Sequence, residues 1–172
     1  MLRAAGSFFI IAATTLLGES RASELRGQYR KLEQLRQLVC RIQSEVRYAR
    51  SPLEEIFRMT AGTTKEPYQT WLLSLAANMR LRNGETFAGL WETSVRENLE
   101  GAGLPAEEIV RLRELGAGLG TQDVQMQIRI LELYLMQLST AMGEIREGMK
   151  TKIKLYHCLG FMSGMLIVIL LL

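Results

Sequence analysis

Two segments without a charged side chain enclose a densely charged middle in this 172-residue chain. They are residues 4–18 and residues 155–172. A helix rises about 1.5 Å per residue, so the second segment would reach about 27 Å, against roughly 30 Å for the hydrocarbon core of a bilayer. A soluble helix that is apolar all round would have to be enclosed on every side. We therefore predict that residues 155–172 form a transmembrane helix.

The first apolar segment is shorter and permits two interpretations. Arg3 followed by an apolar stretch is also the pattern of a cleaved signal peptide. The charged residues that begin at Glu19 continue directly into a helical pattern, which favours an uncleaved anchor. We predict a second membrane helix over residues 1–18.

Basic residues beside the two apolar segments predict their orientation. Lys and Arg side chains concentrate on the cytoplasmic side of membrane segments. Outside the two segments lies only Arg3, whereas the flanks that face the middle carry Arg21, Arg26, Arg30, Lys31, Arg36, Arg146, Lys150, Lys152 and Lys154. We expect residues 19–154 to be a cytoplasmic domain on a bilayer-embedded hairpin, with both termini on the far side.

Helical spacing and helix-breaking residues divide the middle into about six predicted helices, with no convincing strand. Apolar residues at steps of three and four run from Leu25 to Ala49 and from Val124 to Met149, which predicts two long helices that pair antiparallel. Prolines and glycines delimit four shorter helices near residues 52–62, 67–84, 85–101 and 105–115. The predicted fold class is all-α, a helical bundle with one transmembrane helix at each end.

Helix-start signals give more local expectations. In SPLE, residues 51–54, Ser51 is the expected N-cap, Pro52 the first helical residue and Glu54 the acid of a capping box. Glu107 and Glu108 fall in a first turn, where the helix dipole favours acids. We interpret such acid pairs as helix caps and not as metal ligands.

The glycine-rich stretch LGAGLG, residues 115–120, lacks the GxxxxGK[ST] pattern of a phosphate loop. We predict that its glycines break a helix and permit a tight joint between neighbouring helices. Trp71 and Trp91 lie at helical positions among leucines, and we predict that both belong to the core.

The residue types of a catalytic site are almost absent. The one histidine, His157, falls at the predicted membrane boundary, and Asp123 is the one aspartate. A serine or cysteine nucleophile therefore has no evident base. We expect no enzymatic activity, metal or cofactor, and free thiols at Cys40 and Cys158. The net charge of +3 is too small to indicate nucleic-acid binding.

Gly160 and Gly164 form a GxxxG pattern with Ser163 beside them in the last apolar segment. Small residues at this spacing let transmembrane helices pack closely. The pattern predicts helix association without naming the partner; the first apolar segment is one candidate, and a second copy of the chain is another. A homo-oligomer is therefore left open.

Several stretches along the chain jointly resemble one family. They are AATT at residues 12–15, EVRYARSPL at 45–53, LWETSV at 90–95, LGAGLGTQDVQMQIRIL at 115–131 and LGFMSGMLIVILLL at 159–172. The chain resembles the stage III sporulation protein AB family of endospore-forming bacteria. The family positions that it matches include Pro52, Trp91, Leu119, Gly120, Asp123 and Gln127.

This resemblance implies a component of the channel that joins the mother cell to the developing forespore, on the mother-cell side. The family's soluble part is similar to the cytoplasmic domain of the inner-membrane platform protein of type II secretion and type IV pilus systems. It implies a cytoplasmic sporulation ATPase and other channel membrane proteins as partners. We therefore expect a non-enzymatic platform or adaptor. The alternative is a membrane-tethered helical regulator, which would be expected to carry a sensing domain outside the membrane.

Overall fold

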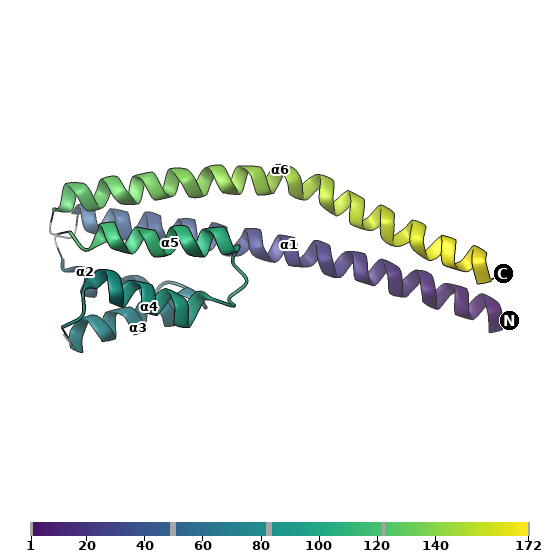
Figure 1. Ribbon diagram of the computed structural model, residues 1–172, viewed down its shortest axis with the longest axis horizontal. Coiled ribbons are helices and arrows are strands. Elements are labelled where there is room, and N and C mark those ends of the chain that lie inside the picture. Colours follow the sequence, from purple (N-terminus) through teal and green to yellow (C-terminus); the bar gives the residue numbers. More distant parts are fainter. Residues whose placement is uncertain (1, 49–50, 82–83, 122, 172) are drawn as a thin grey trace. The chain divides into compact units, whose positions relative to one another are not determined.

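The computed structural model describes the backbone of residues 2–48, 51–81, 84–121 and 123–171. Side chains are not described at residues 2–19, 21–22, 150, 152–153, 156–157, 159–161, 163–164 and 166–171. The described chain forms six helices and no strand (Figure 1). They are α1 (Leu2–Tyr48), α2 (Leu53–Ala61), α3 (Tyr68–Leu81), α4 (Phe87–Leu99), α5 (Ala106–Leu119) and α6 (Val124–Leu171). The predicted all-α class and the number of helices are confirmed.

The helices belong to two compact units. One unit contains Arg30–Met142, and the other contains Met1–Tyr29 together with Gly143–Leu172. α1 and α6 each contribute residues to both units, and each is one continuous helix. The predicted domain limits, 1–18, 19–154 and 155–172, thus fall within continuous helices and remain predictions about the membrane.

Over the residues whose side chains are described, no helix is both long and apolar enough to cross a membrane. The two predicted membrane segments lie mainly outside those residues. His157, at the predicted membrane boundary, also has an undescribed side chain.

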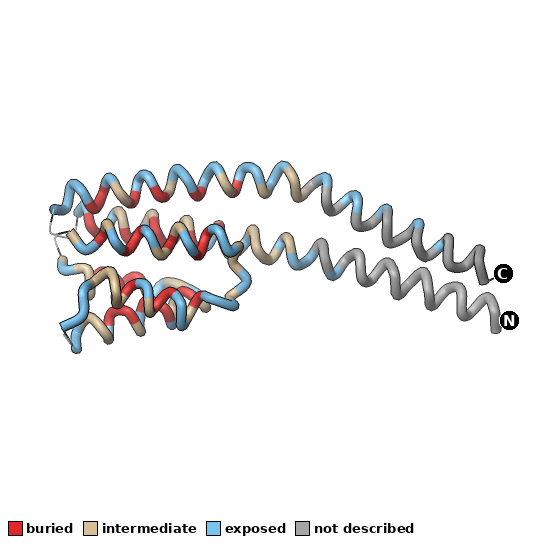
Figure 2. Tube along the Cα trace, viewed as in Figure 1, coloured by how far each residue is buried: buried red, intermediate tan, exposed pale blue. Residues whose placement is uncertain are grey.

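The apolar stripes of the two long helices supply much of the core of the Arg30–Met142 unit. Figure 2 shows buried positions recurring at helical spacing along both of them. The buried hydrophobic residues on these helices are Leu32, Leu35, Leu38, Val39, Ile42, Val46, Ile128, Leu131, Tyr134, Leu138 and Met142. Val124, the predicted start of the second stripe, is 46% exposed, and the polar Gln127 is the first buried residue of α6.

The four short helices pack in sequence order around an aromatic cluster. α2 packs on α3, α3 on α4, and α4 on α5. The buried rings of Trp71 and Trp91 meet edge to face, with centroids 5.0 Å apart, and Phe57 and Phe87 lie against Trp91. Such aromatic pairs contribute about 0.5–1.5 kcal/mol beyond burial of their area. The predicted core position of both tryptophans is confirmed.

The three predicted proline starts are displaced by one residue, because α2, α3 and α5 begin directly after Pro52, Pro67 and Pro105. Pro52 has φ −62° and ψ 149°, so it occupies the N-cap position of α2 and the prediction of Ser51 as the cap is wrong. Pro105 takes the same place before α5. The reason is the extended ψ of these two prolines, which makes the carbonyl of each the first acceptor: Pro52 O accepts from the amides of Glu55 and Ile56 at 3.0 and 3.2 Å.

A glycine follows the end of each of the four short helices, but the fourth helix extends further than predicted. Gly62 is the C-cap of α2, and Gly84 and Gly101 have positive φ values of 76° and 93° in the turns after α3 and α4. By contrast, α5 continues through Gly116 and Gly118 to Leu119. The predicted break is therefore confirmed only at Gly120, the last residue of LGAGLG and the C-cap of α5, whereas Gly116 and Gly118 lie inside the helix because helix packing requires small residues there.

Candidate functional site

Four of the residues that carry the family resemblance lie together where α5 ends and α6 begins. Leu119 is the buried last residue of α5, and Gly120 is its C-cap. Asp123 directly precedes α6, and Gln127 lies in the first part of that helix. We refer to residues 119–127 as the α5–α6 joint.

Gln127 holds this joint closed. Its side chain is nearly buried, and Nε2 donates hydrogen bonds to Leu119 O at 3.1 Å and to Thr121 O at 2.6 Å. The last carbonyls of a helix have no partner within the helix, and burying them unpaired is costly. The Gln127 amide therefore supplies the hydrogen-bond donor that these two carbonyls lack within the helix and would otherwise obtain from water.

Asp123 starts α6 from the other side of the joint. Its Oδ1 accepts a hydrogen bond from Gln125 N at 3.0 Å, and its backbone carbonyl accepts from Gln127 N at 3.0 Å. An aspartate at the N-cap of a helix typically accepts a hydrogen bond from a backbone amide of the first turn in this way. Asp123 and Gln127 thus act on opposite ends of the same connection.

Two glycines of α5 let neighbouring side chains lie against its backbone. A Cβ atom on Gly116 would lie 2.1 Å from Trp91 Cδ1, and one on Gly118 would lie 2.7 Å from Ile130 Cδ1. Trp91 Nε1 donates to Leu112 O at 2.7 Å, which fixes the indole against α5. The close approach predicted for LGAGLG is confirmed, and it explains why these glycines stand inside a helix.

The other predicted site residues are not part of the joint. Pro52 is exposed at the start of α2. Gly160, Ser163 and Gly164 belong to α6, but their side-chain surroundings lie outside the described residues. Their role in helix association remains a prediction.

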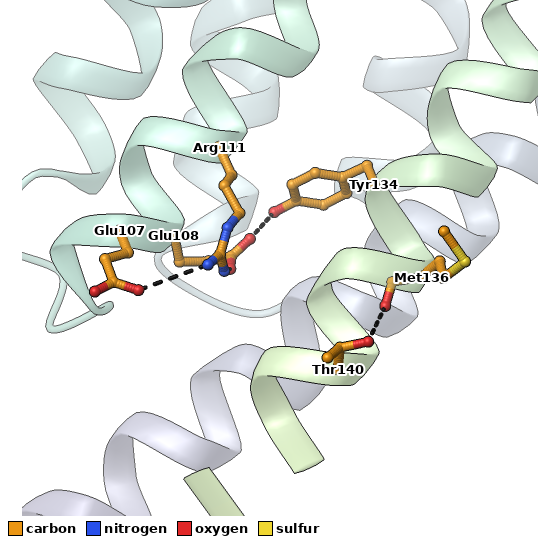
Figure 3. Close-up of polar contacts among 6 residues, drawn as sticks. All are labelled: Glu107, Glu108, Arg111, Tyr134, Met136 and Thr140. Carbon is orange, nitrogen blue, oxygen red and sulfur yellow. Dashed lines mark hydrogen bonds and ion pairs between the residues drawn. The ribbon is translucent and has the colours of Figure 1, made fainter. Parts of the chain in front are cut away.

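A buried acid was missed in the sequence. Glu108 is only 2% exposed, and its carboxylate accepts hydrogen bonds from the Tyr134 hydroxyl at 2.6 Å and from Arg111 Nη1 at 3.1 Å. In Figure 3 the Tyr134 ring extends from α6 toward this carboxylate on α5, while Glu107 contacts the other side of Arg111. The capping role predicted for Glu108 is thus incomplete, because this carboxylate also joins α5 to α6.

Burial shapes the chemistry of the two tyrosines near Glu108. It raises the pKa of Tyr134 well above the ordinary value near 10, and the charge and hydrogen bond of Glu108 act in the same direction. Burial, followed by the charge of Glu108, also raises the pKa of Tyr68. Both phenols therefore stay protonated and donate: the Tyr68 hydroxyl bonds to Lys31 O at 2.8 Å and so ties α3 to α1.

The polar groups buried in this unit thus connect helices. Among the described side chains, no group of three His, Cys, Asp or Glu residues could hold a metal ion. Cys40 is partly buried and Cys158 is exposed, and both are free thiols. The α5–α6 joint and the Glu108 contacts fix α5 and α6 relative to each other, and Tyr68 does the same for α3 and α1.

Comparison with known proteins agrees with the sequence resemblance. The sequence model of the family described as Stage III sporulation protein AB matches residues 3–172. Stage III sporulation protein AB of Bacillus subtilis (strain 168) is 26% identical over 171 residues, which cover 99% of each chain. A solved structure of Stage III sporulation protein AB shares the fold, with a TM-score of 0.66 and 20% identity, over 72% of this chain and 97% of that one. The predicted membership is confirmed, and the chain belongs to the Stage III sporulation protein AB family.

Proposed function

We propose that this protein is a non-enzymatic membrane platform of the mother cell–forespore channel. In this role it links a cytoplasmic secretion-type ATPase to the membrane proteins of the channel. The proposal combines family membership with the resemblance to platform proteins of type II secretion systems. It also takes residues 1–18 and 155–172 as membrane anchors, with the Arg30–Met142 unit in the cytoplasm and both termini beyond the membrane.

The observation that carries the proposal is the use of buried polar groups in the Arg30–Met142 unit. Glu108 and Tyr134 join α5 to α6, Gln127 closes the joint between the same helices, and Tyr68 ties α3 to α1. Such contacts hold helices in one arrangement and serve no evident reaction. A unit that keeps its shape, with its first and last helices extending beyond it, suits an adaptor that transmits or resists force.

Site-specific cross-linking of the full-length protein in sporulating cells tests this role. A photoreactive amino acid is placed at exposed positions on different helices, such as Arg58, Arg96 and Leu133. We expect products with the sporulation ATPase and with a channel membrane protein. The same amino acid at buried Leu75 is the control and should give no intermolecular product. Absence of both partners from every exposed position would contradict the platform role.

A topology reporter fused after Leu172 tests the membrane arrangement separately. A reporter that is active only outside the cytoplasm should be active at this position, and a reporter that is active only in the cytoplasm should be inactive. Activity of a cytoplasmic reporter at the same position would contradict the proposed hairpin, whatever the partners are.

A further inference from the structure

A groove runs along α1 beside the connection between α2 and α3. Two adjoining cavities of about 260 and 490 Å³ make up the groove, and Arg41 and Thr63 belong to the walls of both. On α1 the walls extend from Gln34 to Glu45, which is about 16 Å along the helix axis. The groove is therefore long enough for a short peptide segment.

Arg41 is held in place at the centre of this groove without a carboxylate partner. Its Nη1 donates to Thr63 Oγ1 at 2.5 Å and lies 3.4 Å from Thr63 O, and both acceptors are neutral. The side chain is exposed, and no described acid lies within ion-pair distance of it. The guanidinium thus has no carboxylate partner among the described residues, and its hydrogen bonds to Thr63 hold it at the groove, which lowers the cost of binding a carboxylate there.

The first cavity is positively charged. Besides Arg41, its walls include Lys65 and the polar side chains of Gln34 and Thr64, and they include no acid. The nearby Glu33 is not a wall residue and is neutralised by Arg36 at 2.7 Å, and it also accepts from the wall residue Gln37 at 3.2 Å. Glu66 accepts from the Thr70 hydroxyl at 2.7 Å. An anionic group is consequently favoured in this half of the groove.

The second cavity has a different character. Its walls include Met59, which is 52% exposed, and Cys40. They also include Glu45, which lies one helical turn from Arg41 and disfavours an anion at this end. An apolar side chain fits beside Met59, and a carboxylate fits only on the Arg41 side.

We propose that this groove binds an acidic segment of a partner protein. A carboxylate of that segment pairs with Arg41 and Lys65, and an apolar side chain a few residues away packs on Met59. A free phosphate or sulfate would fill only the first cavity and leave Met59 uncovered, so the two-part groove favours a peptide. The inference rests on the proposed function only in that this unit binds another protein.

The test places a photoreactive amino acid at Gln37 or at Met59 of the full-length protein in sporulating cells, followed by mass spectrometry of the cross-linked peptides. We expect both positions to reach one segment of one partner, with an Asp or Glu close to the cross-linked residue. Arg41→Glu should lower the yield about tenfold or more, because repulsion replaces attraction at the same point. An Asp or Glu in the partner changed to Arg should restore the yield with Arg41→Glu.

Arg129→Glu is the matched control, because Arg129 is exposed on α6 and lies outside both cavities. It should leave the yield unchanged. Lys65→Glu is a second test variant in case Arg41→Glu loses the helical circular dichroism of the parent protein. Cross-links to a lipid or to peptides without acids, or equal yields from Arg41→Glu and the parent, would overturn the inference. If other surfaces still reach the ATPase or the channel, the proposed function survives that result.

Discussion

Trp91 occupies the space that a side chain on Gly116 would need. A Cβ atom at Gly116 would lie 2.1 Å from Cδ1 and 2.2 Å from Cγ of the indole. The indole cannot withdraw easily, since Nε1 is bonded to Leu112 O and the ring meets Trp71 edge to face. A glycine inside a helix costs about 1 kcal/mol relative to alanine, and here that cost permits α4 and α5 to pack in contact.

Gly116→Ala should therefore destabilise the protein although alanine is the better helix former. We expect a net loss of about 1–3 kcal/mol in the free energy of unfolding, the usual range for an overpacked core. Urea unfolding followed by far-UV circular dichroism measures it. Gly143→Ala is the control, because no atom lies within 4 Å of the added Cβ on α6. That change should stabilise by up to about 1 kcal/mol. A similar gain from Gly116→Ala would contradict the steric explanation.

Gln127→Glu should destabilise the protein, because it removes the hydrogen bonds that hold the α5–α6 joint together. The substitution replaces the donor that serves Leu119 O and Thr121 O by a carboxylate that repels both carbonyls. The expected loss of stability at pH 7 is roughly 3 kcal/mol, and it should shrink toward pH 4 as the carboxyl becomes protonated. Gln125→Glu, at an exposed position in the first turn of α6, should be nearly neutral or slightly stabilising. Equal stability of the two variants would show that the joint does not depend on Gln127.

Local sequence patterns were sufficient for the helices and insufficient for the contacts between them. The stripes on α1 and α6 follow from helical spacing alone, and prolines and glycines mark the short helices. The glycines at 116 and 118 looked like a break because the pattern does not show that Trp91 and Ile130 lie against them. Only the three-dimensional packing explains why they are tolerated in a helix.

The same limit applies to the buried acid. Glu108, Leu112, Leu115 and Leu119 follow helical spacing, and this spacing is the signal that could have indicated burial of Glu108 on the apolar face of α5. An acid in a first turn nevertheless suggested a cap, since its partner Tyr134 is distant in the chain. Burial of a carboxylate requires such partners, and a single sequence does not identify them.

Tyr134→Phe should weaken the protein at neutral pH and change its alkaline unfolding. Loss of the hydroxyl removes a hydrogen bond to the Glu108 carboxylate, which is expected to cost about 1.5–3 kcal/mol. The raised pKa of Tyr134 means that the folded state favours the neutral phenol. The contribution of the Tyr134 hydroxyl to the free energy of unfolding is therefore complete below about pH 10, the pKa of a tyrosine in the unfolded chain. It is lost as the pH rises above that value.

The difference in unfolding free energy between the parent and Tyr134→Phe should consequently narrow above pH 10. Urea titrations at several pH values from 7 to 11 measure it. Tyr48→Phe is the matched control, because Tyr48 is 78% exposed on α1, and it should follow the parent at every pH. A constant difference between the parent and Tyr134→Phe across this range would contradict the role of the buried phenol.

Replacing both Gly160 and Gly164 by leucine should impair assembly while leaving membrane insertion intact. Leucines remain apolar, so the segment should still partition into the membrane, but they hold helix backbones apart where glycines allow close packing. We expect the protein in the carbonate-resistant membrane fraction at the parent level, with its cross-links to channel proteins and its support of sporulation reduced roughly tenfold, the effect of about 1.4 kcal/mol. Met162→Leu, an exposed position in the same segment, is the control and should behave as the parent. If assembly and sporulation survive the double change, the last segment serves only as an anchor, and the GxxxG pattern has no part in helix association.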